Sequence, residues 1–347
     1  MDRTELPPSP FERRPRFGRW RFAVAAAVLV MLTLAAYNLP IPVFYTYLPG
    51  PVRDVEGLVE VEGARTYSSE GALYLTTVSV DTRVTFAELV AAALDPTRAV
   101  VRREDVTGGS SLRELQEAQR AQMRESKRHA LEVVFAALGL GKPLGDGAKV
   151  EDTVRGSPAH GELRQGDVIV RVDGERVDTS CDVIRLVDRR EPGDRVELLV
   201  RRRGRQLPIE LSTVENPQQP GTPLIGVILT DLNYRFDPGI TVRFKTGNIA
   251  GPSAGLMFAL ALYDRLTPGD LTAGRRIAGT GEINCGGDVG AIGGVEQKVA
   301  GAEAEGAEIF LAPVANFEAA RAAAGDIEVV AVATFQDALD YLEGLQG

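Results

Sequence analysis

The segment that defines the fold is residues 241–266, TVRFKTGNIAGPSAGLMFALALYDRL. Its pattern predicts a strand, a glycine-containing loop and then a helix that begins at Ser253. Because apolar residues lie on nearly all sides of that helix, we expect it to be buried. A serine at the start of a buried helix has a simple structural role, since its hydroxyl can cap a free backbone N–H. Taken alone, the segment predicts a buried helix and no chemistry.

The pentapeptide GPSAG at residues 251–255 also matches G-x-S-x-G, the nucleophile elbow of α/β-hydrolases. That class of enzyme needs an acid and then a histidine downstream of the serine. The chain has only two histidines, His129 and His160, and both precede Ser253. The order of these residues therefore excludes an esterase of the α/β-hydrolase class.

A second glycine-rich segment follows at residues 279–313, GTGEINCGGDVGAIGGVEQKVAGAEAEGAEIFLAP. Glycines punctuate a predicted strand–turn–strand, and we expect a helix over residues 295–306 and a strand over residues 308–311. Lys298 falls in the first turns of that helix. A lysine on a helix is usually solvated, so its position alone indicates no function.

Together these two segments resemble the proteolytic domain of the Lon family of Ser-Lys peptidases over about residues 224–345. The resemblance implies an α/β (α+β) Lon-type proteolytic domain, with Ser253 as nucleophile and Lys298 as general base. It also implies supporting roles for Thr280, Gly251, Pro252 and Gly255. Ala250 departs from the pattern, because many ATP-dependent members of the family have an acidic residue there.

The chemistry of the site agrees with these residue types. Lysine removes a proton from a serine hydroxyl only when it is neutral, so its pKa of ~10.4 has to fall toward 7–8. Burial among apolar side chains lowers a lysine pKa in this way. We expect Thr280 to orient the amine, backbone N–H groups at the helix start to hold the oxyanion, and Gly251 and Gly255 to let a substrate strand approach. Neither a metal nor a cofactor is expected.

A compact β-rich unit is predicted before the peptidase segments. The motifs that identify it are GSPA, GDVI and DG, at residues 156–159, 166–169 and 173–174. They resemble a PDZ domain of the bacterial, protease-associated kind. Such domains add a peptide as an extra strand and hold its C-terminal carboxylate on backbone amides.

The predicted peptide-binding loop of this PDZ domain lies in residues 133–142, VVFAALGLGK. There Gly139, Leu140 and Gly141 are expected to turn backbone N–H groups toward an anion. His160 is interpreted as a surface residue. Residues 216–223, NPQQPGTP, have the composition of a linker.

The N-terminal part predicts a membrane anchor. No charged residue occurs from Phe22 to Val52, and five arginines precede the apolar run from position 13 onward. The length predicts one transmembrane helix, and the positive-inside rule places the N-terminus in the cytoplasm and the catalytic part outside. The alternative is a cleaved signal peptide, for which residues 34–37 form a poor cleavage site.

Charge and cysteine content exclude some other functions. The net charge is −9, and because residues 1–21 carry +3, the remainder carries −12. An acidic body argues against a nucleic-acid partner. Cys181 and Cys285 form no CxxC motif, so neither a zinc nor a redox site is expected. Two unpaired buried thiols are favoured over a disulfide, although pairing outside the cytoplasm stays open.

The expected domain organisation has five parts. They are a basic tail (1–21), a transmembrane helix (22–42), strands and helices partly packed on the peptidase (50–130), the PDZ domain (131–215) and the proteolytic domain (224–345). Residues 65–80 resemble the first strands of the peptidase domain, which suggests that the PDZ domain is an insertion. The charge-rich first half of a predicted helix at residues 111–139 is interpreted as a solvated face.

The sequence predicts a membrane-anchored serine endopeptidase whose PDZ domain binds or gates protein and peptide substrates. No G-x-x-x-x-G-K-[ST] motif occurs, so ATP-independent cleavage is expected. The resemblance further implies a homo-oligomer, with a hexamer as the form common in the family. The alternative is a non-catalytic, membrane-tethered, peptide-binding scaffold.

Overall fold

A computed structural model describes residues 17–217, 219–247 and 249–346 of the protein. The chain divides into two compact units. The first is formed by residues up to Leu48 together with Ser79–Gly109, and the second by Pro49–Val78 together with Ser110 onward. The basic residues predicted before position 17 lie outside the described part of the chain.

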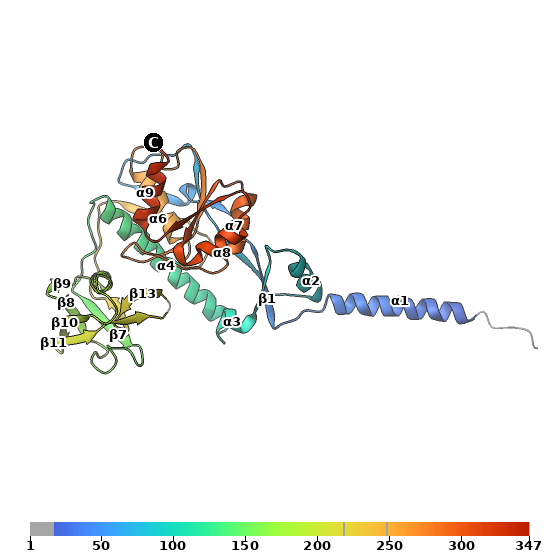
Figure 1. Ribbon diagram of the computed structural model, residues 1–347, viewed down its shortest axis with the longest axis horizontal. Coiled ribbons are helices and arrows are strands. Elements are labelled where there is room, and N and C mark those ends of the chain that lie inside the picture. Colours follow the sequence, from blue (N-terminus) through green and yellow to red (C-terminus); the bar gives the residue numbers. More distant parts are fainter. Residues whose placement is uncertain (1–16, 218, 248, 347) are drawn as a thin grey trace, which may run out of the picture. The chain divides into compact units, whose positions relative to one another are not determined.

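The first unit combines helices with a small sheet (Figure 1). Its elements are α1 (Phe17–Tyr37), β1 (Phe44–Pro49), β5 (Val78–Asp81), α2 (Phe86–Leu94), β6 (Ala99–Arg102) and α3 (Arg103–Thr107). Strand β1 lies between β5 and β6. Helix α2 begins with a capping box in which the Thr85 and Glu88 side chains bind each other's backbone N–H groups.

The transmembrane helix predicted for residues 22–42 is not supported by the structure. Helix α1 covers most of that segment and begins earlier, at Phe17. Among the described residues, no helix has the combined length and apolar character that crossing a membrane requires.

The protease part of the second unit is organised around a five-stranded sheet in the order β2-β4-β16-β19-β20. The strands are β2 (Arg53–Asp54), β4 (Ala72–Leu75), β16 (Arg276–Gly279), β19 (Ile309–Pro313) and β20 (Glu328–Val332). Strand β16 pairs in parallel with both β4 and β19. Because β4 precedes the PDZ sequence and β16 follows it, segments from both sides of the PDZ part build one sheet.

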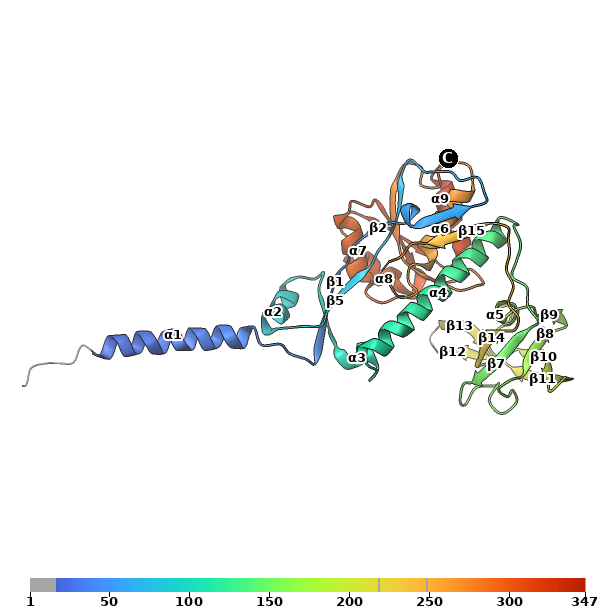
Figure 2. The same ribbon diagram turned by 180° about the vertical axis from the view of Figure 1, so that it is seen from behind.

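Helices surround the sheet and fill the core of this part (Figures 1 and 2). They are η1 (Glu56–Leu58), α4 (Leu112–Ala137), α6 (Gly255–Leu266), α7 (Val295–Ala304), η2 (Val314–Asn316), α8 (Phe317–Ala323) and α9 (Phe335–Gly344). Two ribbons complete it: β3 (Val59–Glu62) with β15 (Thr241–Phe244), and β17 (Glu282–Ile283) with β18 (Val289–Gly290). Helix α6 is buried along most of its length, which confirms the prediction from its apolar composition.

The PDZ part has its own sheet and core. Its elements are β7 (Ala148–Thr153), β8 (Val168–Val172), β9 (Glu175–Arg176), α5 (Ser180–Val187), β10 (Arg195–Arg202), β11 (Arg205–Ser212) and β14 (Val227–Asp231). The strand order is β11-β10-β8-β7-β14, with β9 paired to β8. Strand β14 pairs antiparallel with β7, from Val227 opposite Thr153 to Asp231 opposite Ala148. The PDZ sheet therefore ends with a strand that lies inside the sequence range predicted for the protease.

The linker prediction for residues 216–223 is wrong. Within this range, Asn216 and residues 219–223 belong to an antiparallel hairpin of β12 (Val214–Asn216) and β13 (Gln219–Leu224), in which Val214 lies opposite Leu224. Proline and glycine reduce regular pairing but do not exclude it in a short two-stranded ribbon. Composition alone could not separate this hairpin from a linker.

Candidate active site

The nucleophile segment links strand β15 to helix α6. The helix begins at Gly255, two residues later than predicted, and its N-cap residue is Ala254, which makes no side-chain capping bond. The Ser253 hydroxyl is therefore not used as a helix cap. This excludes the simple structural role considered for that serine, and leaves the hydroxyl available for chemistry.

Helix α7 presents the lysine. Lys298 is the fourth residue of this helix, and its backbone N–H donates to the Gly294 carbonyl oxygen at 3.1 Å. Gly294 has a φ of 66°, and a Cβ there would lie 2.7 Å from Cγ2 of Val78. Only glycine fits this position without strain, so the glycine pair before α7 sets where the helix begins and where Lys298 lies.

The side chains of Ser253, Thr280 and Lys298 meet in one hydrogen-bonded cluster. Lys298 Nζ lies 2.8 Å from Ser253 Oγ and 2.9 Å from Thr280 Oγ1. Thr280 Oγ1 in turn donates to the Ser253 carbonyl oxygen at 3.0 Å. The two distances from Nζ are within the range of normal hydrogen bonds, so the amine lies between hydroxyls on two different segments.

Burial controls the charge of this lysine. Lys298 is 3% exposed, and no carboxylate of the described residues forms an ion pair with it. Burial lowers the pKa of its amine from 10.5 to about 7. Since a buried ammonium without a counter-charge is costly, a substantial fraction of the amine is neutral near neutral pH. A neutral amine beside a serine hydroxyl can accept the hydroxyl proton.

The start of α6 also provides backbone donors. The N–H groups of Gly255 and Leu256 donate to the carbonyl oxygens of Pro252 and Gly281, at 3.2 and 3.1 Å. The N–H groups of Ser253 and Ala254 are therefore the candidate donors for an oxyanion. They lie at the positive end of the α6 dipole, where negative charge is stabilised.

Gly255 does not have the role predicted for it. A Cβ at this position would come within 2.6 Å of both Ile283 Cγ2 and Ser126 Oγ, so its surroundings are protein and not an open substrate channel. Gly251 is different, because a Cβ there would meet nothing within 4 Å. Gly255 allows α6 to pack closely, and only Gly251 fits a role in substrate approach.

Helix α4 fixes the nucleophile segment, and the sequence analysis missed this. Ser126 Oγ donates to the Pro252 carbonyl oxygen at 2.8 Å, and the Gly251 N–H donates to the Gln119 carbonyl oxygen at 3.2 Å. Ser126 is buried. In the sequence, Ser126 is only a small polar residue about one turn before the apolar end of a charged helix. That signal is too weak to identify Pro252, in the loop before α6, as its partner.

His129 of the same helix contacts the strand that follows Thr280. Its Nδ1 lies 3.0 Å from the Ile283 carbonyl oxygen, which can only accept, so Nδ1 carries the proton. Burial, and then the charge of Arg128, lower the pKa of His129. A neutral imidazole is consistent with the structural role that this bond gives it.

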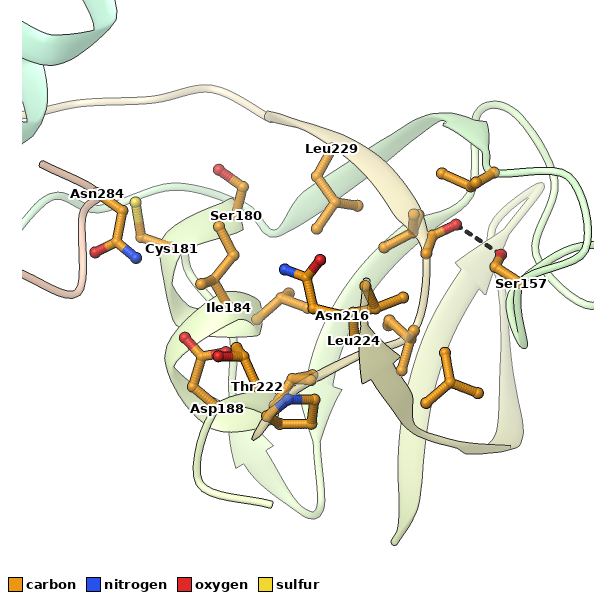
Figure 3. Close-up of a pocket in the computed structure, with 18 of the residues that line it drawn as sticks. Ser157, Ser180, Cys181, Ile184, Asp188, Asn216, Thr222, Leu224, Leu229 and Asn284 are labelled. Atoms are coloured by element: carbon orange, nitrogen blue, oxygen red, sulfur yellow. Dashed lines mark hydrogen bonds between the residues drawn. The ribbon is translucent and has the colours of Figure 1, made fainter. Parts of the chain in front are cut away.

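A large cavity lies between helix α5 and strand β14 of the PDZ part, and residues of α4 and of the β17–β18 turn also line it (Figure 3). Its volume is about 830 Å³. Ile184 of α5 and Leu229 of β14 line it, and the β12–β13 hairpin contributes Asn216 and Leu224. The combination of a helix and the edge strand of a sheet is the arrangement that accepts a peptide as an additional strand.

The predicted binding-loop residues do not line this cavity. Gly139, Leu140 and Gly141 directly follow the end of α4, and the structure does not bring them to the cavity. Residues 224–227 precede and begin β14, and they line it instead. Gly226 there has a φ of 72° and accepts a hydrogen bond from Ser157 Oγ at 3.0 Å.

A disulfide joins Cys181 in α5 to Cys285 in the turn between β17 and β18. The preference for two unpaired thiols is therefore wrong, because residues 104 positions apart come together through the packing of the PDZ part on the protease part. His129 lies near both sulfur atoms. Since the sulfurs are bonded to each other, they provide no thiolate, and the group is not a metal site in this form.

Polar contacts reinforce the same junction. Arg128 Nη1 in α4 lies 2.6 Å from Asp231 Oδ2 at the end of β14. Asp231 Oδ1 accepts from the Ser180 N–H at 2.7 Å, at the start of α5. The Tyr234 hydroxyl donates to Glu132 of α4 at 2.6 Å. Both walls of the PDZ cavity are thus attached to the helix that also holds the nucleophile segment.

Comparison with known proteins identifies both parts. Residues 117–213 match the PDZ domain family, and residues 237–342 match the Lon protease (S16) C-terminal proteolytic domain. The candidate active site lies within the second match, which agrees with the two-part division. Strand β14 lies beyond the range of the PDZ match.

Several characterised proteins are similar over part of the chain. Lon protease 2 of Bacillus subtilis (strain 168) is 38% identical over 109 residues, which are 30% of this chain and 19% of that protein. Lon protease of Roseiflexus castenholzii is 47% identical over 66 residues, 19% of this chain and 8% of that protein. A probable periplasmic serine endoprotease DegP-like of Halomonas elongata is 42% identical over 69 residues, 20% of this chain and 14% of that protein.

Among solved structures, the PDZ domain of the SdrC-like protein Lin2157 from Listeria innocua matches with 26% identity and a TM-score of 0.23. The match covers 24% of this chain and 93% of that one. The chain spans less than a fifth of the length of each of the three proteases from Bacillus subtilis, Roseiflexus castenholzii and Halomonas elongata. What these comparisons support is a chain of mixed α/β structure that contains a PDZ domain and a Lon-type serine protease domain.

Proposed function

We propose that this protein is a serine endopeptidase that cleaves peptide bonds with a Ser253–Lys298 dyad and without ATP. The observation that carries the proposal is the Lys298 amine, which is buried, has a pKa of about 7 and lies 2.8 Å from Ser253 Oγ. A solvated lysine would be almost fully charged at neutral pH and unable to act as a base. The burial of this amine removes that obstacle.

In the proposed reaction the neutral Lys298 amine takes the proton from Ser253 Oγ as that oxygen attacks the substrate carbonyl carbon. The backbone N–H groups of Ser253 and Ala254 stabilise the resulting oxyanion. The Lys298 ammonium then gives its proton to the departing amine as the peptide C–N bond breaks. Water hydrolyses the acyl-enzyme ester by the same steps, with Lys298 again as the base. Thr280 keeps the Lys298 amine oriented toward Ser253 throughout the reaction.

We further propose that the PDZ cavity binds an extended peptide as a strand next to β14. Support comes from the position of β14 at the edge of its sheet and from the apolar lining that α5 provides. A substrate or a regulatory peptide bound there would be tethered to the unit that carries the dyad.

The test of catalysis is cleavage of an unfolded protein. The full chain is incubated with casein without ATP, in parallel with Ser253→Ala and with Ser212→Ala, a control at an exposed serine of β11. We expect peptide release by the wild type and by the control, and none by Ser253→Ala. Equal release by wild type and Ser253→Ala would refute the dyad. If all three are inactive but bind peptide at the PDZ cavity, the alternative of a non-catalytic scaffold is correct.

Location and assembly are also proposals. An extracytoplasmic position of the catalytic part is supported by the Cys181–Cys285 disulfide, because disulfides persist in oxidising compartments. Attachment to a membrane rests on the apolar N-terminal sequence and on the exposed apolar side chains of α1, such as Phe22 and Leu29. Resistance of the protein to alkaline extraction from membranes tests the attachment. Light scattering tests the homo-oligomer, for which the family resemblance suggests a hexamer.

A further inference from the structure

A second cleft lies beside the nucleophile segment, between α4 and residues 246, 247, 249 and 250. Its volume is about 530 Å³. The α4 wall contributes three cationic side chains, Arg120, Arg124 and Lys127. The opposite wall includes Thr246, Ile249 and Ala250. None of the described residues that line the cleft is acidic.

Two hydrogen bonds place this cleft next to the catalytic serine. The Gly251 N–H binds the Gln119 carbonyl oxygen, and Ser126 Oγ binds the Pro252 carbonyl oxygen. The stretch of α4 from Gln119 to Ser126 therefore lies against the two residues that precede Ser253. Arg120 and Arg124 belong to this same stretch, and they line the cleft together with Ala250, three residues before Ser253.

The positive charge of the cleft is not neutralised within the described part of the protein. Lys127 Nζ contacts only uncharged oxygens, those of the Phe244 carbonyl at 3.3 Å and the Thr246 hydroxyl at 2.7 Å. Burial lowers the pKa of Lys127. Arg120 and Arg124 form no ion pair among the described residues, and like charges four positions apart on a helix repel each other.

The same helix pairs its cations elsewhere. Arg113 lies 3.1 Å from Glu117, and Arg128 lies 2.7 Å from Glu125. Among the described residues of this helix, the cations without an acidic partner are those that line the cleft, in a chain whose net charge is −9. This contrast favours a negatively charged occupant over a merely solvated helix face, which was the interpretation of the sequence.

We propose that this cleft binds acidic side chains of the substrate and gives the peptidase a preference for aspartate or glutamate close to the scissile bond. The proposal rests on the proposed function and specifies its substrate class. A guanidinium group binds a carboxylate through two parallel hydrogen bonds, so Arg120 and Arg124 are the specificity-determining residues.

The test uses two fluorogenic peptides that differ only in glutamate or glutamine at the positions flanking the cleaved bond. For the wild type we expect kcat/KM to be roughly 3- to 30-fold higher for the glutamate peptide, as expected for one or two partly exposed ion pairs. The preference should fall as salt rises. The double variant Arg120→Gln with Arg124→Gln should lose it. Arg113→Gln, on the same helix but outside the cleft, should keep it.

Charge reversal separates recognition from a structural effect. Arg120→Glu with Arg124→Glu should prefer a peptide with lysine at the same positions, which a damaged fold cannot produce. Equal kcat/KM of the wild type for the glutamate and glutamine peptides would overturn the proposal, as would an unchanged preference in the charge-reversed protein.

A binding measurement keeps this test independent of catalysis. Fluorescence anisotropy with labelled forms of the same two peptides is carried out on Ser253→Ala, with and without Arg120→Gln and Arg124→Gln. If no peptide is cleaved by the wild type but the glutamate peptide binds more tightly in an arginine-dependent manner, the proposed function fails and the acidic-substrate cleft stands. Equal binding of both peptides refutes the cleft.

Discussion

The Lys298 amine should control stability as well as activity, because it is ionisable and almost completely buried. Its pKa in the folded protein, about 7, lies below the ~10.4 of an unfolded lysine. Between these two values the unfolded chain binds one more proton than the folded one, so the unfolding free energy of the wild type rises with pH. Below about pH 7 the folded protein bears the whole cost of burying the charge, roughly 5 kcal/mol for a pKa lowered from 10.5 to about 7.

Replacement by methionine removes this cost. Lys298→Met keeps a similar length and volume but loses two hydrogen bonds, each worth about 1 kcal/mol. Thr280 still donates to the Ser253 carbonyl oxygen, so one polar contact of the cluster survives. At pH 6 we therefore expect the inactive variant to be more stable than the wild type by roughly 2–4 kcal/mol. The difference should shrink as the pH rises above 7 and disappear or reverse near pH 10.

The assay is urea unfolding of the full chain between pH 6 and pH 10, followed by far-ultraviolet circular dichroism. Lys142→Met is the control, because that side chain is 63% exposed and solvent screens its ion pair with Asp178. In the wild type, kcat/KM should rise about tenfold per pH unit below pH 7 and then level off. A stability difference between Lys298→Met and wild type that stays constant across this range would refute the reasoning, as would a less stable variant at pH 6.

Three further changes test the residues that position or stabilise the candidate site. Gly294→Ala should lower the unfolding free energy by about 1–3 kcal/mol and reduce kcat, because a φ of 66° is strained for alanine. Gly293→Ala is the control and should change little, since a Cβ there meets open space. Thermal unfolding measures the stability of the two variants, and peptide cleavage measures their activity. Thr280→Val removes the hydroxyl that lies 2.9 Å from the Lys298 amine, and it should lower kcat/KM roughly 10-fold, measured on a neutral peptide. Replacing Cys181 and Cys285 by alanine opens a 104-residue loop and should lower the urea-unfolding free energy by about 2–5 kcal/mol, an effect that reductant should reproduce in the wild type.

The candidate catalytic residues Ser253 and Lys298 could be named from the sequence because their signal is local. GPSAG and the glycine pair before Lys298 are short motifs, and their chemistry limits which residues can serve as nucleophile and base. The sequence also excluded the α/β-hydrolase order of nucleophile, acid and histidine, since both histidines precede Ser253. It could not provide the burial of Lys298, because segments distant in the sequence, such as those of Ser253 and Thr280, meet this side chain only in the folded protein.

The errors concern contacts between distant segments. Whether Cys181 and Cys285 meet depends on how the PDZ part packs on the β17–β18 turn, and no local pattern encodes that packing. The PDZ cavity was assigned to the residues after α4 because Gly139 and Gly141 look like an anion-binding loop. Its edge strand instead comes from residues 227–231, which pair with β7 across nearly the whole PDZ sequence.

Helix α4 carries contacts to both functional parts within little more than one turn. Ser126 binds the nucleophile segment, Arg128 binds Asp231 at the end of β14, and His129 binds Ile283 beyond Thr280. An α-helix rises only 1.5 Å per residue and resists bending, so these contacts cannot move independently of one another. A peptide strand bound next to β14, as proposed above, would lie beside the strand that ends at Asp231, and a displacement of Asp231 would reach the Ser126–Pro252 hydrogen bond through Arg128. The helix whose charge-rich first half was interpreted as a solvated face thus lines both the peptide cavity and the cationic cleft, and it binds the segment that carries Ser253.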